Sequence, residues 1–157
     1  MQARKPIVIL LADDDEDDRL LTTDALKENR LANAVHCVVD GEELMDYLNR
    51  RGKFSDPQEF PIPGIILLDL NMPKMDGREA LKRIKTDSQL RHIPVVILTS
   101  SKTEEDILRS YDLGVNSFIL KPVSFDALVD ILRTVQHYWF EIVELPPEVA
   151  VENKDCD

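Results

Sequence analysis

The chain has 157 residues, of which 43% are hydrophobic and 31% are charged, a balance typical of a folded globular domain and unlike that of a disordered chain. Its 30 acidic and 19 basic residues give a formal net charge of −11, which argues against direct DNA binding and against binding to anionic membranes. With only two cysteines and no apolar run of 18 residues, we expect a cytoplasmic protein with neither a disulfide framework nor a membrane span.

Short, continuous apolar runs alternate with helical patterns along the chain. Acidic residues follow the first run: Asp15 is a good N-cap, and Glu16 to Asp18 fall in the first turn of a helix, where the helix dipole favours negative charge. We therefore expect Asp15 to Asp18 to begin and solvate a helix without taking part in chemistry. The expected strands, in chain order, are residues 7–12, 34–39, 65–70, 95–100 and 117–120.

Capping residues and apolar spacing place the later helices. Asp40 and Glu43 form a capping box, and Ser101 begins another, while an apolar stripe from Phe125 to Trp139 marks a long last helix. The expected elements are helices at 41–50, 77–86, 101–114 and 125–139, with a polar, proline-containing loop at 50–64. The repeated alternation of strand and helix predicts a parallel sheet with helices on both faces.

Charged and hydroxyl side chains stand at the carboxyl ends of the expected strands, where ligands bind in open parallel sheets. They are Asp13 and Asp14 after the first strand, Asp69 in the third, Thr99 in the fourth and Lys121 after the fifth. Clustered carboxylates raise one another's pKa unless a cation joins them, and Mg²⁺ prefers oxygen ligands. The pattern predicts a phosphoryl-transfer site with Asp69 as the nucleophile and with Thr99 and Lys121 as phosphoryl-binding groups.

The segments LLADDDEDD, ILLDLNMPKMDG, VVILTSS and SFILKP resemble the receiver domain of two-component response regulators over residues 6–137. The 50–64 loop and the ending HYWFEIVELPP are similar to those of single-domain regulators associated with cyanobacterial and bacterial phytochromes. The resemblance implies a flavodoxin-like, doubly wound (βα)5 fold with a five-stranded parallel sheet of order 2-1-3-4-5. We assign residues 1–143 to the receiver domain, including an extended last helix, and residues 144–157 to a C-terminal tail.

The resemblance also implies the chemistry. Asp69 would accept a phosphoryl group from a sensor histidine kinase, with a phytochrome-type photoreceptor kinase as the specific candidate. The implied ligands of Mg²⁺ or Mn²⁺ are Asp13, Asp14, Asp69 and the main-chain oxygen of Asn71. The protein would label itself and slowly lose the label, and it would not turn over a substrate as an enzyme does.

Further roles come from the same resemblance. Thr99 and Phe118 would form the switch, in which the aromatic ring follows the hydroxyl after phosphorylation. Asn71 and Ser101 flank the site and would tune the lifetime of the phosphoryl group. The bond between Lys121 and the following proline would be cis.

The last helix carries more apolar residues than one stripe requires, and a monomer should hide such a surface. The residues assigned to an interface are Val129, Tyr138, Phe140 and Val143. We expect a homodimer or partner interface here, in preference to packing of the tail onto its own domain. The output face would comprise the 101–114 helix, the 117–120 strand and the last helix.

Three rival functions remain open from the residues alone. A Ca²⁺-binding module could use the acidic loop 13–24, although Asp18 stands where an EF-hand needs glycine. A flavodoxin-like redox protein would have to bind FMN phosphate beside six acidic residues, which would repel it. A phosphatase-like enzyme with an aspartate nucleophile could use the Asp13-x-Asp15 spacing, but the position of Asp69 argues against it.

Overall fold

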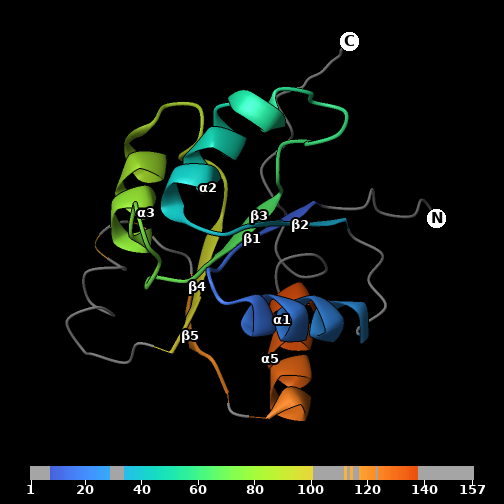
Figure 1. Ribbon diagram of the computed structural model, residues 1–157. Coiled ribbons are helices and arrows are strands. Elements are labelled where there is room, and N and C mark those ends of the chain that lie inside the picture. The colour runs from blue at the N-terminus through green and yellow to red at the C-terminus, as the bar shows by residue number, and fades with distance from the viewer. Residues whose placement is uncertain are drawn as a thin grey trace.

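The computed structural model describes residues 8–28, 34–100, 112, 114, 117–122 and 124–137. Within these residues, five strands form one parallel sheet in the order β2-β1-β3-β4-β5, which confirms the predicted flavodoxin-like topology (Figure 1). The strands are β1 (Ile9–Ala12), β2 (Val35–Val38), β3 (Ile65–Leu68), β4 (Val95–Thr99) and β5 (Ser117–Leu120). The helices are α1 (Glu16–Glu28), α2 (Gly41–Leu48), η1 (Gly52–Phe54), α3 (Gly77–Thr86) and α5 (Phe125–His137).

Helices cover both faces of the sheet (Figure 1). α2 and α3 pack together on one face, and α1 and α5 pack together on the other. In β1, Leu10 and Ala12 enter the core under α2 and α3, whereas Ile9 and Leu11 belong to the core under α1 and α5. Because both faces are buried, alternation of polar and apolar residues disappears, and the strand reads as one continuous apolar run.

Acidic caps begin the helices that lead away from the functional end of the sheet. Asp15 Oδ1 accepts a hydrogen bond of 3.1 Å from the Asp18 amide, which places the start of α1 where the sequence predicts it. Asp40 Oδ1 accepts one of 2.7 Å from the Glu43 amide, and Glu43 Oε1 accepts another of 3.0 Å from the Val39 amide. This capping box orients α2.

The 50–64 loop is anchored by aromatic rings. Ring centroids of Phe54 and Phe60 lie 5.0 Å apart, and those of Tyr47 and Phe54 lie 5.2 Å apart. The Tyr47 hydroxyl, on α2, donates a hydrogen bond of 2.8 Å to the main-chain oxygen of Pro61. These contacts fix both halves of the loop against α2.

The first residues of α2 and α3 are glycines that touch the backbone of the loop after β3. The Gly77 amide donates a hydrogen bond of 2.9 Å to the Leu70 oxygen, and the Gly41 amide donates one of 2.9 Å to the Met75 oxygen. A Cβ on Gly77 would collide with the main-chain oxygen of Asp69, and a Cβ on Gly41 would collide with that of Met75. The loop is therefore held between two helix N-termini.

Two expectations are corrected. Val129 is only 6% exposed and packs in the core between α5 and the sheet, so it is unavailable to a partner. The Lys121–Pro122 bond is trans, as are the other peptide bonds of the described residues. The intrinsic preference of such bonds is only about 0.5–1 kcal/mol, so the surrounding structure decides the isomer.

Several expectations fall outside the described residues. These are Ser101 and most of the 101–114 helix, the interface residues Tyr138, Phe140 and Val143, and the 144–157 tail. Along the part of the chain that is described, no helix has the length and apolar character needed to cross a membrane.

Candidate functional site

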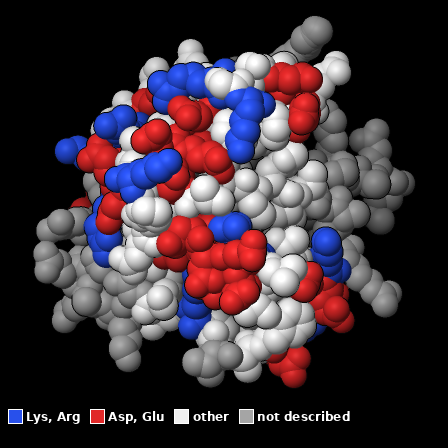
Figure 2. Space-filling view, in the orientation of Figure 1, with Lys and Arg blue, Asp and Glu red and all other residues white. Residues whose placement is uncertain are grey.

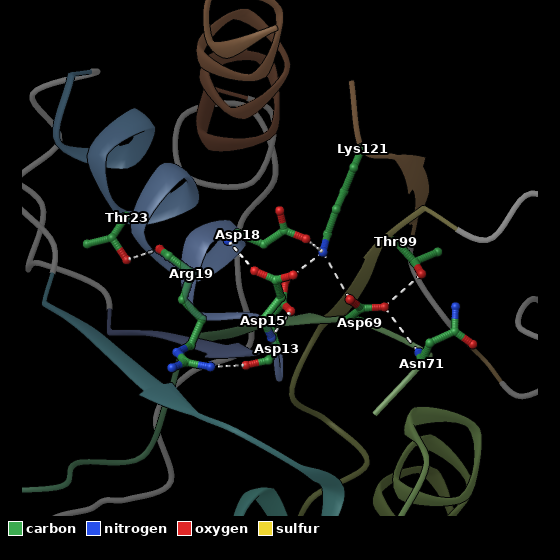
Figure 3. A network of polar contacts seen from close by, with 9 residues as sticks. All are labelled: Asp13, Asp15, Asp18, Arg19, Thr23, Asp69, Asn71, Thr99 and Lys121. Atoms are coloured by element: carbon green, nitrogen blue, oxygen red, sulfur yellow. Dashed lines mark hydrogen bonds and ion pairs between the residues drawn. The ribbon is translucent and has the colours of Figure 1, made fainter. Parts of the chain in front are cut away.

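Backbone pairing brings the predicted site residues together at the carboxyl ends of the strands (Figure 3). The Asp69 amide donates a hydrogen bond of 2.9 Å to the Ala12 oxygen, so Asp13 and Asp69 emerge side by side from β1 and β3. The Lys121 amide donates one of 2.9 Å to the Thr99 oxygen, which holds the end of β5 against β4. Pairing of β1, β3, β4 and β5 thus positions the side chains of the site.

The Lys121 ammonium is shared by three carboxylates from three different elements. Its Nζ lies 2.6 Å from Asp13 Oδ2, 2.9 Å from Asp69 Oδ2 and 2.9 Å from Asp18 Oδ2. Figure 3 shows the side chain reaching down from the end of β5 into this group. An ammonium has three N–H donors, so each carboxylate receives one.

The charge state of Lys121 follows from these contacts. Burial lowers the pKa of Lys121, but the hydrogen bonds to Asp13, Asp18 and Asp69 raise that pKa by more, and the net direction is upward. The ammonium therefore stays cationic throughout the physiological range. It acts as a fixed positive charge beside the carboxylates.

Asp69 is buried, with 6% of its surface exposed, and both of its carboxylate oxygens accept hydrogen bonds. Oδ1 accepts hydrogen bonds of 2.7 Å from the Thr99 hydroxyl and 3.1 Å from the Asn71 amide, while Oδ2 binds Lys121. An isolated buried carboxylate would be costly, and these donors offset that cost. They also fix the direction in which the carboxylate points.

Asp13 is buried more deeply, with 1% exposed. Its Oδ1 accepts a hydrogen bond of 3.0 Å from the Asp15 amide, and its main-chain oxygen accepts one of 2.9 Å from Arg19 Nη1. Burial raises the pKa of Asp13 and outweighs the opposing effect of Lys121, and the charge of Asp69 adds to the rise. A cation bound at the cluster would favour the ionised carboxylate.

Three carboxylates are close enough to share a metal ion. One carboxylate oxygen from each of Asp13, Asp14 and Asp69 can be chosen so that all lie within 4.8 Å of one another, with Asp14 exposed to solvent. Oxygen donors with one open side are what Mg²⁺ requires, because it retains several water ligands. Figure 2 shows a contiguous group of acidic side chains over the start of α1, so the site lies in a negative field. The residues therefore fit a hard divalent cation.

Asp18 is the site residue that sequence reasoning missed. The cap at Asp15 is as predicted, but the Asp18 carboxylate turns toward the strand ends and pairs with Lys121 instead of only facing solvent. No spacing in the sequence signals this contact, because Asp13 and Asp14 precede the first helical residue, Glu16. Residues 16–24 are helical, so the acidic run does not form a Ca²⁺-binding loop.

Phe118 lies at the edge of the site's supporting core. It is half-buried, it pairs with Ile97 in the sheet register, and it packs against the cluster under α2 and α3. Thr99 lies two residues after Ile97, so strand alternation directs both residues of β4 to the face on which Phe118 packs. Ser101, which is expected to flank the site together with Asn71, is outside the described part of the chain.

Comparisons with known proteins agree with this arrangement. The family model of the response regulator receiver domain matches residues 9–133. Response regulator Rcp1 of Synechocystis sp. is 37% identical over 145 residues, covering 92% of this chain and 97% of Rcp1.

Solved structures give the same result. The phosphorylated cyanobacterial phytochrome response regulator RcpA superposes with a TM-score of 0.84 at 39% identity, covering 91% of this chain and 100% of RcpA. The Mn²⁺-bound form of Rcp1 superposes with a TM-score of 0.81 at 38% identity, covering 90% of this chain and 100% of Rcp1. With this fold, these strand-end residues and these relatives, the chain belongs to the response regulator receiver domain family.

Proposed function

We propose that Asp69 is the phosphoacceptor of a two-component phosphorelay. The observation that carries the proposal is the environment of its carboxylate, which is buried, bound by Thr99, Asn71 and Lys121, and adjacent to two further carboxylates. A carboxylate oxygen of Asp69 attacks the phosphorus of a phosphohistidine on a sensor kinase. A P–O bond forms, the P–N bond breaks, and its electron pair leaves with the imidazole nitrogen.

Asp13, Asp14 and Asp69 would hold Mg²⁺ or Mn²⁺, with the main-chain oxygen of Asn71 as a further ligand. The bound ion supplies neutralisation of the negative charge on the phosphoryl oxygens. The Mn²⁺-bound structure of Rcp1 supports an ion of this class. Lys121 adds a second, permanent positive charge from the carboxyl end of β5.

The Thr99 hydroxyl now donates to Asp69 Oδ1, and it would donate to a phosphoryl oxygen once Asp69 is modified. Phe118 would then move into the space beside Thr99, because it packs on the same face of the sheet. Asn71 and Ser101 would set how quickly water removes the label. Loss of the label by slow autodephosphorylation resets the protein without turnover of a separate substrate.

The output surface would be the face formed by residues 101–114, β5 and α5, acting by partner binding or homodimerisation. Without Val129, the interface would depend on Tyr138, Phe140 and Val143. A sensor histidine kinase would be the phosphoryl donor, and the relation to RcpA, a cyanobacterial phytochrome response regulator, supports a phytochrome-type kinase. The net charge of −11 supports action through protein partners without direct DNA binding.

The test is labelling with a small phosphoryl donor. Incubation of the protein with Mg²⁺ and acetyl phosphate is expected to add one acid-labile group of about 80 daltons, seen by intact-mass spectrometry. Asp69→Ala is expected to remain unlabelled, whereas Asp17→Asn, which changes an exposed aspartate, keeps the label. A label on Asp69→Ala contradicts the assignment, and rapid turnover of phosphate esters by the unmodified protein favours a phosphatase-like enzyme.

A further inference from the structure

Asp18, in the first turn of α1, brings that helix into contact with the Lys121 ammonium. We propose that Asp18 is a positioning residue that retains the Lys121 ammonium when a divalent cation occupies the carboxylates of Asp13 and Asp69. This inference rests on the proposed function, because it concerns the same site. The observation behind it is that the ammonium contacts all three carboxylates, at 2.6 Å, 2.9 Å and 2.9 Å.

Two cations require the same carboxylates. Asp13 and Asp69 belong both to the set that binds Lys121 and to the three-carboxylate group that fits a divalent ion. A doubly charged ion placed at these carboxylates repels the ammonium, and the repulsion is strong because the site is partly buried. The ammonium must then move away from at least one of its present partners.

Asp18 is the partner that the ammonium can keep. It is outside the three-carboxylate group, and its side chain is 39% exposed, whereas the Asp13 and Asp69 side chains are 1% and 8% exposed. An ammonium that shifts toward Asp18 therefore moves toward solvent without losing its ionic partner. Its displacement costs less than it would in a site with only Asp13 and Asp69.

Asp18 is held in place by backbone contacts. Its amide donates to the Asp15 side chain at 3.1 Å, and the next residue, Arg19, binds the main-chain oxygen of Asp13 at 2.9 Å. These bonds tie the first turn of α1 to the end of β1, so the Asp18 carboxylate stays within reach of Lys121. Figure 3 shows the carboxylate on the α1 side of the ammonium, opposite Asp69.

Asp17 provides a matched control. It is adjacent in the first turn of α1, it carries the same charge, it is exposed, and it makes no ion pair with a described residue. Asp17→Asn and Asp18→Asn therefore change the net charge and the helix-end electrostatics alike. They differ in whether Lys121 loses a partner.

The first measurement is the affinity of the unphosphorylated protein for Mg²⁺, by calorimetric titration at physiological ionic strength. Asp18→Asn is expected to weaken Mg²⁺ binding roughly fivefold, the effect of a partly exposed ion pair. Asp17→Asn is expected to weaken it by less than about twofold, because its charge is screened. Asp18→Glu, which restores the carboxylate, is expected to recover most of the affinity.

The second measurement follows the ammonium itself by NMR of protein with ¹⁵N-labelled lysine, the Lys121 signal being the one absent from Lys121→Gln. In the unmodified protein, Mg²⁺ is expected to shift this signal while its hydrogens stay protected from exchange. In Asp18→Asn, Mg²⁺ is expected to abolish the protection. A merely structural role for Asp18 would not make the protection depend on Mg²⁺.

The outcomes separate the two proposals. If the unmodified protein binds Mg²⁺ and labels Asp69 while Asp18→Asn and Asp17→Asn behave alike, the role of Asp18 is wrong and the proposed function stands. If the unmodified protein neither binds Mg²⁺ nor becomes labelled, both are wrong. Circular dichroism of each variant checks that α1 remains folded.

Discussion

The Thr99 hydroxyl donates a buried hydrogen bond of 2.7 Å to Oδ1 of Asp69, linking the ends of β4 and β3. The bond contributes to the stability of the sheet in the unphosphorylated protein, and the same hydroxyl is proposed to bind the phosphoryl group. The Thr99 hydroxyl therefore contributes both to the stability of the sheet and, under the proposed function, to signalling. Variants that keep or remove the hydroxyl distinguish the two contributions.

Thr99→Val preserves the shape of the side chain and removes the donor. We expect the free energy of unfolding to fall by about 1–2 kcal/mol, because Asp69 Oδ1 loses a buried hydrogen bond. Thr99→Ser keeps the hydroxyl and is expected to retain this hydrogen bond. Urea unfolding without Mg²⁺ measures both, and a Val variant that is as stable as the unmodified protein would contradict the role of the bond.

Asp14→Asn tests the metal site without disturbing the core, since Asp14 is exposed while Asp13 and Asp69 are buried. We expect Mg²⁺ affinity to fall by at least about tenfold, as for loss of a metal-site contact. Without Mg²⁺, the free energy of unfolding should stay within about 0.5 kcal/mol of the original value. Calorimetric titration and urea unfolding provide the two readouts, and unchanged affinity would exclude Asp14 as a ligand.

A double variant extends this test to labelling. Asp13→Asn combined with Asp14→Asn leaves Asp69 as the last carboxylate of the group and is expected to abolish Mg²⁺-dependent labelling by acetyl phosphate. Asp17→Asn, which removes the charge of a nearby exposed aspartate, is the control. Full labelling of the double variant would show that the metal lies elsewhere.

Tyr47→Phe tests how the 50–64 loop is anchored, through the pH dependence of stability. Burial raises the pKa of Tyr47 to about 12, with a smaller opposing effect from Arg50, whereas an unfolded tyrosine titrates near a pKa of about 10. The neutral phenol therefore stabilises the folded state fully below pH 10, and this contribution is lost as the pH rises toward 12.

We expect Tyr47→Phe to lose about 1 kcal/mol at neutral pH, the value of its hydrogen bond to Pro61. The variant should then lose less stability than the original protein between pH 10 and 12, so that the two curves converge and then cross. Urea unfolding at several pH values measures this. Parallel curves would show that the phenol does not titrate with unfolding.

Gly77→Ala tests whether the close packing of Gly77 against the loop after β3 positions Asp69. The added methyl group would collide with the main-chain oxygen of Asp69, so we expect a loss of about 1–3 kcal/mol in unfolding free energy together with reduced labelling. Gly52→Ala is the comparison: Gly52 has φ of +60° and open space around its Cβ position, so it costs about 1–2 kcal/mol without affecting labelling. Equal labelling of both variants would show that the packing of Gly77 does not position Asp69.

The parallel sheet and the main site could be predicted from local signals, whereas the strand order 2-1-3-4-5 followed from the resemblance to receiver domains. Central strands such as β1 and β3 are buried on both faces and read as continuous apolar runs, whereas the edge strand β2 is more exposed and its apolar run is interrupted by His36. Asp13, Asp69 and Lys121 follow strands directly, so parallel pairing alone brings them to one edge.

Asp18 and Val129 could not be placed in this way. The direction of the Asp18 carboxylate depends on the angle at which α1 leaves β1, which no residue pattern specifies. On α5, the adjacent residues Leu128 and Val129 are both buried, so the apolar face is wider than a single stripe. The excess apolar residues of this helix therefore include core residues, and Val129 is one of them.

The last site residue in the chain, Lys121, belongs to the edge of the sheet, because β5 pairs only with β4 among the described strands. During synthesis, β1 to β4 leave the ribosome before β5, together with Asp13, Asp14, Asp69 and Thr99. Their fixed counter-charge arrives only when residue 121 emerges and β5 docks. A chain that lacks β5 therefore lacks this counter-charge, and under the proposed function it would become competent for phosphoryl transfer only after β5 has docked.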